Sequence, residues 1–406
     1  MSAANQHMNE ETKPVRLLSL DVFRGLTIAG MVLVNNPGPS GASFSQLNHA
    51  EWHGWTPTDF IFPFFLFIVG ISITLALSKR AEAGGSMSDL YWKITKRAAL
   101  IYLLGFFLAS FPFFKPETVD FSGGFGSDLS SLWASSKDLF ANVRLTGVLQ
   151  RIAFCYLISA LLFLHTRWRT QLYVAVGLCL GYWALMTLIA APGFAAGDLS
   201  KEGNLAAWLD RVLLGNHIWK GGGKIYDPEG IFSTLPAIAT TLSGVLTGHW
   251  LRTRKPQMEK IAGMFAVGAA CVAVGWLWHW WFPFNKPLWS SSYVFFMSGL
   301  GLVTLAGCVW LIDEHGYARW TKPFEIFGVN ALALFVGSGF LARCMMLWKT
   351  PRANGKTGNL SGWFYDHLFA FWAAPKIGSF LYAFCYLLFW LGIMTILYRK
   401  KIYIKV

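Results

Sequence analysis

The most chemically reactive side chains of this sequence lie together in a short segment, residues 48–59, which reads NHAEWHGWTPTD. The segment holds two histidines, a glutamate, an aspartate and two tryptophans, and it separates two strongly apolar runs, 17–35 and 60–77. An imidazole, with an ordinary pKa of about 6.5, takes a proton from an amine near neutral pH. It can also carry an acyl group as an acyl-imidazole. A polar loop of this kind between two apolar runs indicates the active site of a membrane enzyme.

Within the segment, His49 is the candidate base or acyl carrier. The residues alone leave an alternative open, a loop histidine held by a backbone carbonyl. Asp59 fits two roles. The run from Thr56 to Asp59, with Pro57 at the first helical position, is a capping box that begins a helix. A carboxylate near His49 would also fix the tautomer of the imidazole and raise its basicity.

The composition shows what kind of scaffold must position these residues. Of the 406 residues 54% are hydrophobic and 14% are charged, whereas a soluble domain carries roughly 25% charged residues. Apolar runs near the ~20 residues needed to cross a bilayer recur along the chain. We predict an all-α, polytopic integral membrane bundle in the cell inner (cytoplasmic) membrane. Residues 17–398 form its single transmembrane domain, flanked by an N-terminal tail (1–16) and a basic C-terminal tail (399–406).

The hydrophobic pattern predicts about ten transmembrane helices. Their ranges are 17–35, 57–78, 97–114, 146–165, 171–190, 231–250, 261–281, 290–312, 324–346 and 377–398. With alternating loops, 20 of the 34 basic residues fall on the side of the termini and 12 on the other. Because basic residues concentrate in cytoplasmic loops, both termini are predicted to be cytoplasmic, and the His49 loop faces the opposite side.

Charge and cysteine usage exclude several other classes of protein. The net charge of +13 is spread over the ends of the apolar runs and favours anionic lipid rather than nucleic acid. The six cysteines all lie in apolar runs and form no C-x-x-C pair. His49 and His53 are four residues apart, but the following Gly54 and Pro57 indicate a loop, so we expect no metal.

Several short blocks together resemble the heparan-α-glucosaminide N-acetyltransferase family of transmembrane acyltransferases. They occur in the family's order over about residues 16–335, most of the chain. The blocks are LDVFRG (20–25), VN (34–35), HAEWHG (49–54), DFIFP (59–63), GVLQRI (147–152), YDPEG (226–230), FNKPLW (284–289) and GVNAL (328–332). The whole set is similar to a bacterial relative associated with N-acetylglucosamine utilisation.

This resemblance implies transfer of an acetyl group from cytosolic acetyl-CoA, a co-substrate, to the amino group of glucosamine or a related amino sugar. It implies that His49 is the catalytic histidine and that Asn35 lies beside it. The Asn35 amide would then donate to the thioester oxygen or orient His49, although an asparagine at this position also suits a helix C-terminus. The sequence departs from the lysosomal members at Glu51 and His53, where they have Ser and Asn, which affects the expected sugar.

Six residues are candidates for binding the sugar: Glu51, Arg151, Glu229, Asn285, Lys286 and Trp289. Arg151 heads an apolar run and is expected to face the bundle and pair with a carboxylate, because burying it unpaired is costly. Asp227 is expected to cap the helix beginning near residue 231, and capping explains Glu229 equally well. Trp289 suits the apolar face of a sugar or an interfacial aromatic belt.

Three charged residues are candidates for binding CoA, namely Asp21, Arg24 and Arg97. Arg24 and Asn35 lie eleven residues apart on one helix face, about 16 Å, so phosphates near Arg24 would place the thioester near Asn35. A salt bridge between Asp21 and Arg24 is the simpler alternative, and Arg97 also suits snorkelling to lipid.

Two other functions remain open from the residues alone. The first is an amino-sugar transporter, which membrane-embedded polar residues and proline-broken helices would suit. The second is an O-acetyltransferase of an envelope polysaccharide, which keeps the chemistry and changes the acceptor. The expected partners are the amino sugar, acetyl-CoA and the lipid bilayer, without nucleic acid, and a homodimer is compatible with this interpretation.

Overall fold

The computed structural model describes residues 17–39, 41–82, 84, 86–119, 125–351 and 357–404. It is about 72% helical with almost no strands, as predicted for an all-α membrane bundle. The predicted N-terminal tail, 1–16, lies outside the described residues, and the predicted C-terminal tail is described as far as residue 404.

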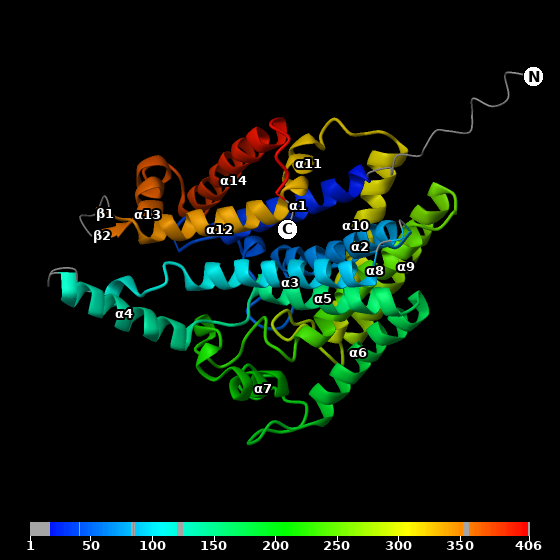
Figure 1. The fold of residues 1–406 in the computed structure, drawn as a ribbon, viewed down its shortest axis with the longest axis horizontal. Coiled ribbons are helices and arrows are strands. Elements are labelled where there is room, and N and C mark those ends of the chain that lie inside the picture. The colour runs from blue at the N-terminus through cyan, green and yellow to red at the C-terminus, as the bar shows by residue number, and fades with distance from the viewer. Residues whose placement is uncertain are drawn as a thin grey trace, which may run out of the picture.

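Long helices form the bundle, some nearly parallel to its longest axis and others inclined to it (Figure 1). They are α1 (Leu18–Asn35), α2 (Ile61–Glu82), α3 (Met87–Ser110), α5 (Val148–His165), α6 (Trp168–Leu188), α8 (Thr234–Leu251), α9 (Gln257–Trp278), α10 (Ser291–Cys308) and α14 (Pro375–Arg399). Within the described residues, seven spans are long and apolar enough to cross a membrane, and a bent helix pair adds an eighth if counted as one. Helices α3 and α8 are long but not among these. The number ten and the cytoplasmic location of both termini therefore stay predictions.

The ninth predicted span is not one continuous helix, which corrects the expectation for 324–346. Helices α11 (Lys322–Val329) and α12 (Ala331–Leu347) meet at Asn330 with a bend of 82°. Asn330 leaves the helical conformation, with φ −117° and ψ 34°. Its amide donates to the Ile402 carbonyl at 3.1 Å and accepts from the Ile404 N–H at 2.9 Å. The buried amide breaks the helix because it binds the C-terminal segment instead.

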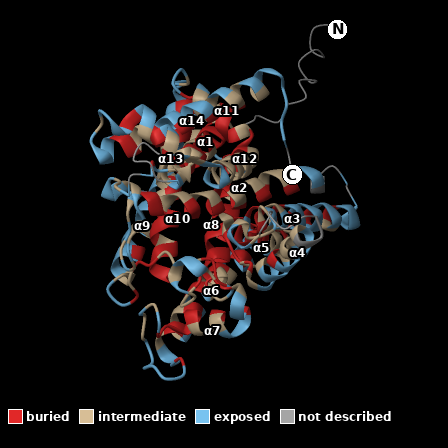
Figure 2. Ribbon diagram, turned by 90° about the vertical axis from the view of Figure 1, so that its left-hand side faces the viewer, coloured by how far each residue is buried: buried red, intermediate tan, exposed pale blue. Residues whose placement is uncertain are grey.

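Short elements gather at the end of the bundle opposite the start of α1 (Figure 1). Helix α4 (Phe125–Asn142), helix α13 (Leu360–Tyr365) and an antiparallel pair of strands, β1 (Lys349–Pro351) and β2 (Thr357–Asn359), lie there. Helix α7 (Leu205–Leu214) belongs to the long loop between α6 and α8. The buried residues lie inside the bundle, while exposed ones lie on these connections and on the outer faces of long helices such as α3 and α9 (Figure 2).

Helices α2 and α8 cross closely at two glycines. A Cβ on Gly70 would lie 1.9 Å from the Thr241 carbonyl oxygen, and one on Gly244 would lie 2.0 Å from the Phe67 carbonyl oxygen. Small residues let helix backbones approach this closely in membranes. The contact matters for the site because α2 follows Asp59 and α8 follows the loop that carries Glu229.

We expect Gly244→Ala to destabilise the protein by roughly 1–3 kcal/mol, because the added methyl group meets backbone and the helices must separate. Gly177→Ala is the matched control, since a Cβ there meets no atom within 4 Å. Denaturant or thermal unfolding in detergent measures both variants. Equal stability of the two variants would contradict the close α2–α8 contact.

Candidate active site

The site begins with a hydrogen-bonded pair, His49 and Asp59. Nδ1 of His49 lies 2.7 Å from Oδ1 of Asp59. The His49 side chain is 51% exposed, whereas the Asp59 side chain is 1% exposed. When the carboxylate accepts a proton donated by Nδ1, the lone pair of Nε2 points away from it and is available to accept another. The expected contact between Asp59 and His49 is thus present, and the orienting role of Asp59 stays a prediction.

Asp59 is held rigidly by the turn that contains it. Its second oxygen, Oδ2, accepts from the N–H of Ala50 at 3.1 Å, the N–H of Thr56 at 3.0 Å and the Thr56 hydroxyl at 3.2 Å. The capping box predicted from Thr56 to Asp59 is present, with Pro57 in the first turn. Asp59 thus closes the capping box before α2 and contacts His49 at the same time. Neither expected role excludes the other.

A second loop, residues 279–290, is bound to the His49 loop. The N–H of Gly54 donates to the Phe284 carbonyl at 2.8 Å, and Gly54 has φ +102°, a conformation that favours glycine. Nearby, Nδ2 of Asn285 and Nδ1 of His53 are 3.4 Å apart. These contacts between residues more than 200 positions apart place the FNKPLW block against the HAEWHG block.

Lys286 brings a positive charge to the His49–Asp59 pair. Its Nζ lies 3.0 Å from Nδ1 and 3.2 Å from Nε2 of His49, and 3.5 Å from Oδ1 of Asp59. Since it is almost equally far from both ring nitrogens, it is not aligned with the lone pair of either one. Burial lowers the pKa of Lys286 below its usual value, partly offset by Asp59 and Glu229. The ammonium is thus easier to deprotonate than that of a surface lysine.

A group of charged and aromatic residues lies beside these loops and is called the wall below. Its members are Arg144, Asp227, Glu229, Trp219 and Tyr226. Arg144 forms ion pairs with both Asp227 and Glu229, and Thr146 donates to Asp227 at 2.6 Å. The guanidinium also lies over the ring of Trp219, 5.8 Å from its centroid. Burial lowers the pKa of Arg144, but the two carboxylates outweigh it and the net pKa is raised. Arg144 therefore remains charged at any working pH.

Aromatic rings connect this wall to the His49 loop. Tyr226 packs against Trp219 at 5.6 Å and against Trp52 at 5.0 Å between ring centroids. The Trp52 indole donates to the Leu199 carbonyl at 2.8 Å. Carboxylates next to aromatic faces suit the recognition of a polar ring with apolar faces, such as a sugar.

Arg151 lies beneath the wall and not in it. It is 1% exposed, and it donates to the Gly230 carbonyl at 3.1 Å and to the Ser233 hydroxyl. Among the described residues, the hydrogen bonds of Arg151 go to no carboxylate. The predicted pairing of Arg151 with a carboxylate is therefore wrong. Arg144 takes both nearby acidic partners, so Arg151 bonds to the turn before α8.

The YDPEG block does not begin a helix, which corrects the capping role expected for Asp227. Helix α8 starts later, at Thr234, with Ser233 before it. The Asp227 carboxylate instead accepts from the N–H of Glu229 at 2.9 Å and from that of Trp219 at 3.1 Å. Side-chain contacts with Arg144 and Thr146 compete successfully with helix capping.

Asp210, on α7, is a buried acid below the same turn. Its Oδ1 accepts from the N–H of Ile231 at 2.9 Å. Burial raises the pKa of Asp210 to about 7, and the charge of Asp227 adds to the rise. The folded-state pKa is thus above the ordinary value of 3.8. Asp210 therefore adds its full contribution to the free energy of unfolding below about pH 4. This contribution is lost as the pH rises through 7.

We expect the wild-type protein to lose on the order of 4 kcal/mol of stability from this group between pH 4 and 8. Asp210→Asn removes the titration, so its unfolding free energy should depend less steeply on pH over that range. Melting temperatures in detergent at several pH values measure the difference. Parallel pH curves for the two proteins would contradict it.

The remaining candidates for sugar binding differ in exposure. Glu51 is exposed in the His49 loop. Asn285 is buried and accepts from the N–H of Leu288 at 2.8 Å. Trp289 is 1% exposed, and its indole donates to the Thr240 hydroxyl at 3.0 Å. The last two side chains support the loop that carries Lys286.

Asn35 is the final residue of α1, and its side chain is exposed. The neighbouring Asn36 donates to the Val32 carbonyl at 2.8 Å and has φ −127°, so the helix does not end in a left-handed residue. Helix α1 contacts the turn 57–60, which carries Asp59. Asn35 is thus at the same end of the bundle as the site.

The candidates for CoA binding lie on different helices. Arg24 forms the predicted ion pair with Asp21 at 2.9 Å. Its guanidinium also donates to the Ser72 hydroxyl at 3.0 Å and to the Gly328 carbonyl at 3.3 Å. Arg97 is exposed on α3, over the ring of Tyr156 at 5.0 Å. Arg24 is therefore tied to α2 and α11, while Arg97 packs on α5.

Sequence reasoning missed three residues of the wall, namely Arg144, Trp219 and Tyr226. A signal existed for two of them. Arg144 precedes the GVLQRI block by three residues, and Tyr226 opens the YDPEG block. The two carboxylates of the YDPEG block require a basic partner, and Arg144 lies close to another block. Arg151 was the stronger candidate for that partner because it heads an apolar run.

The family model and the two relatives that match this sequence all belong to one family. The model of the catalytic region of heparan-alpha-glucosaminide N-acetyltransferase matches residues 16–277. The Homo sapiens protein of that name is 28% identical over 449 aligned positions, which cover 97% of this chain and 60% of the relative. The Mus musculus protein is 27% identical over 460 positions, covering 100% of this chain and 63% of the relative. The chain thus spans less than two thirds of the length of these relatives. The region matched by the family model contains His49, Asp59 and Arg144, and this region ends before Lys286.

Proposed function

Because the chain belongs to the heparan-alpha-glucosaminide N-acetyltransferase family, we propose that it is a membrane N-acetyltransferase. It transfers acetyl from cytosolic acetyl-CoA to the amino group of glucosamine or a related amino sugar. The observation that carries the proposal is the 2.7 Å contact between Nδ1 of half-exposed His49 and Oδ1 of buried Asp59. This pairing leaves Nε2 of His49 as the proton acceptor that amine acetylation requires.

In the direct route, the neutral amine attacks the thioester carbonyl carbon. The C–N bond forms, the C–S bond breaks, and CoA leaves as a thiolate. Nε2 of His49 takes the proton that the nitrogen loses and returns it to the sulfur, so atoms and charge balance. Asp59 stabilises the imidazolium that exists between the two transfers. Asn35, at the same end of the bundle, is the proposed donor to the oxygen as charge develops.

A two-step route uses the same residues. Nε2 of His49 attacks the thioester carbonyl carbon, the C–S bond breaks, and CoA leaves as a thiolate. The neutral amine then attacks the acetyl carbon, the bond to Nε2 breaks, and the proton that the amine loses ends on the thiolate sulfur. Both routes require Nε2 to be unprotonated and accessible. The contact with Asp59 supplies the first condition and the exposure of His49 the second.

The charged wall is the proposed acceptor subsite. Glu229 and Asp227 lie beside the aromatic rings of Trp219 and Tyr226. Glu229 would accept from a sugar hydroxyl or the ammonium group, and the rings would cover an apolar face of the sugar. The Asp227 side chain is fully buried, so its proposed part is to hold Arg144. Arg144 holds both carboxylates in place.

Lys286 is proposed to stabilise the oxyanion that forms on the thioester carbonyl, since preorganised positive charge lowers such barriers. We expect Lys286→Met to lower kcat by roughly 10²-fold. Because burial lowers the pKa of Lys286, wild-type activity should fall on the alkaline side as the ammonium deprotonates. Lys286→Arg, with a side-chain pKa above about 12, should move that fall to higher pH. An alkaline limb that is identical in wild type and Lys286→Arg would contradict this role.

An acceptor series tests the proposed reaction. The purified protein in detergent is incubated with acetyl-CoA and either glucosamine, galactosamine or glucose, and free CoA thiol and acetylated sugar are quantified. We expect one thiol for each N-acetylated amino sugar and no product with glucose. Acetylated glucose, or acetyl esters of the amino sugars, would replace the proposal with O-acetyl transfer.

A further inference from the structure

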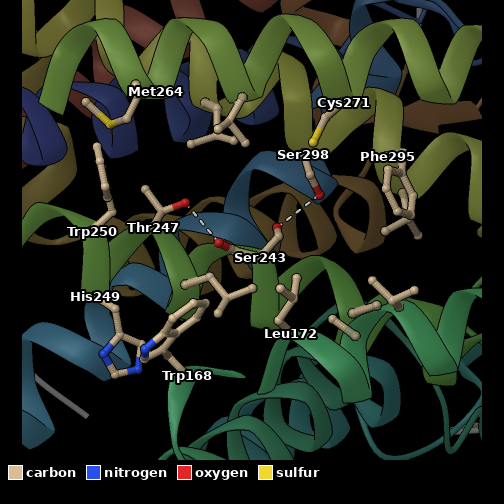
Figure 3. Close-up of a pocket in the computed structure, with 18 of the residues that line it drawn as sticks. Trp168, Leu172, Ser243, Thr247, His249, Trp250, Met264, Cys271, Phe295 and Ser298 are labelled. Atoms are coloured by element: carbon tan, nitrogen blue, oxygen red, sulfur yellow. Dashed lines mark hydrogen bonds between the residues drawn. The ribbon is translucent and has the colours of Figure 1, made fainter. Parts of the chain in front are cut away.

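A large cavity lies away from the candidate active site, between α6, α8, α9 and α10 (Figure 3). Its volume is about 750 Å³. Trp168 and Trp250 lie toward one end of it, and Cys271 and Phe295 toward the other (Figure 3). Its size is that of a pocket for a drug-sized ligand, yet the proposed acetyl transfer makes no use of it.

The wall of the cavity offers an occupant almost only hydrocarbon. Ser243 donates to the Ser298 hydroxyl at 3.0 Å, and Thr247 donates to the Ser243 carbonyl at 2.9 Å (Figure 3). Nε2 of His249 lies 3.0 Å from the Gln171 amide oxygen. The polar side chains thus bond to the protein itself. The occupant should be apolar over most of its length, which does not fit the charged and hydrated body of CoA.

The cavity is placed to admit a molecule from the bilayer. Helices α6 and α9, which form two of its sides, each have only 22% of their apolar window buried inside the protein, so they lie at the rim of the bundle. From Trp168 to Cys179 the lining follows α6 for eleven residues, roughly 16 Å. One leaflet of the hydrocarbon core is about 15 Å thick. The cavity is therefore long enough to hold a chain that spans one leaflet.

One end of the cavity is strongly basic. Arg169 lies over the Trp168 ring at 5.5 Å, and Lys255 lies over the Trp250 ring at 5.0 Å, so both tryptophans at this end carry a cation. Segments 166–171 and 249–260 together contain six Lys and Arg residues and one acidic residue, Glu259. Aromatic and basic side chains at the end of an apolar groove match the position of lipid headgroups.

We propose that this cavity is a binding site for an anionic phospholipid. The acyl chain occupies the space between α6 and α9, and the phosphate lies at the end marked by Arg169 and Lys255. The positive charge at this end of the cavity favours an acidic headgroup. The length of the cavity fits an acyl chain of the leaflet whose headgroups lie at the same end. The bound lipid fills a space that the helices leave open and so stabilises the bundle.

Two pairs of matched variants test the acyl-chain site. Val267 lines the cavity on α9, while Val274, two turns further on the same helix, is also exposed and does not line it. Leu172 and Leu180 form the same kind of pair on α6. The purified proteins are equilibrated with mixed micelles of detergent and phosphatidylglycerol, and retained lipid is counted by native mass spectrometry. We expect Val267→Trp and Leu172→Trp to retain at least about five-fold less lipid than Val274→Trp and Leu180→Trp.

The headgroup site is tested by a competition between phosphatidylglycerol and phosphatidylcholine. Wild type should retain the acidic lipid in preference, and the double variant Arg169→Gln/Lys255→Gln should lose that preference while still retaining lipid. Arg319→Gln, a basic residue outside the two segments, is the control. The use of two helices for the tryptophan series keeps the test decisive if one variant fails to fold.

Three results would overturn the proposal. The first is equal lipid retention by both members of each tryptophan pair. The second is retention of detergent alone by wild type at saturating phosphatidylglycerol. The third is a lipid-free dimer that Val267→Trp converts to a monomer, which would assign the groove to a second copy of the chain.

Discussion

Replacing His49 with alanine is expected to lower kcat for acetyl transfer by roughly 10²–10⁴-fold, the range that general-base catalysis contributes. Alanine removes Nε2, the acceptor for the amine proton and the acyl carrier of the two-step route. The side chain is half exposed, but its loss removes the 2.7 Å partner of the buried Asp59 oxygen and leaves Lys286 at 3.5 Å, so we expect a stability loss of about 1 kcal/mol. Initial rates of CoA thiol release with saturating glucosamine measure the effect.

His367→Ala is the matched control, because His367 is a second exposed histidine, whose Nδ1 contacts the Trp363 carbonyl at 2.8 Å near α13. The control should retain wild-type kcat, and both variants should melt within a few degrees of wild type. A His49→Ala enzyme within about three-fold of wild type would show that another group accepts the proton. In that case Lys286 would be the next residue to test.

Asp59→Asn is expected to lower kcat by roughly 10²–10⁴-fold through the tautomer of His49. The carboxylate accepts a proton from Nδ1 of His49 at 2.7 Å. An amide NH₂ group in its place would donate to Nδ1, so the ring proton would move to Nε2 and block the acceptor. The imidazolium would also lose its neighbouring negative charge. Steady-state kinetics should show the loss mainly in kcat, with KM for the amino sugar little changed.

Thr56→Val separates this catalytic role of Asp59 from its structural one. The Thr56 hydroxyl donates to the Asn48 carbonyl at 2.6 Å and lies 3.2 Å from Oδ2 of Asp59, the oxygen that does not contact His49. The variant removes both contacts of the hydroxyl and leaves Oδ1 of Asp59 free to contact His49. It should therefore lower stability by about 1 kcal/mol and kcat by less than ten-fold. Equal losses of kcat in Thr56→Val and Asp59→Asn would assign Asp59 a structural role alone.

Local patterns predicted the features that depend on neighbours in the chain. The capping box at Asp59 and the ion pair between Asp21 and Arg24 are both present. The residues involved are three positions apart, so helical geometry brings them together without tertiary information. His49 and Asp59 also lie within one short loop, which is why their contact could be predicted from the sequence, while its catalytic role stays a proposal.

Contacts between distant segments were not predictable in this way. Arg144 and Asp227 are separated by 83 positions, and nothing in either segment specified the other as its partner. Hydropathy favoured Arg151, whose deep burial the structure confirms but whose bonds go to Gly230 and Ser233. Lys286 was expected to bind the sugar, and its position over the His49 ring follows only from the packing of two loops. The bend at Asn330 likewise depends on the C-terminal segment.

The central claim is that His49 drives acetyl transfer from CoA to an amino sugar, and one assay tests it most directly. Purified wild type and folded His49→Ala are incubated with acetyl-CoA and glucosamine, and free thiol and N-acetylglucosamine are measured together. The proposed function predicts equal amounts of both products with wild type and initial rates lower by roughly 10²-fold or more with the variant. If wild type releases no thiol with any amino sugar, while vesicles containing it take up labelled glucosamine unchanged, the protein is a transporter and the account is wrong.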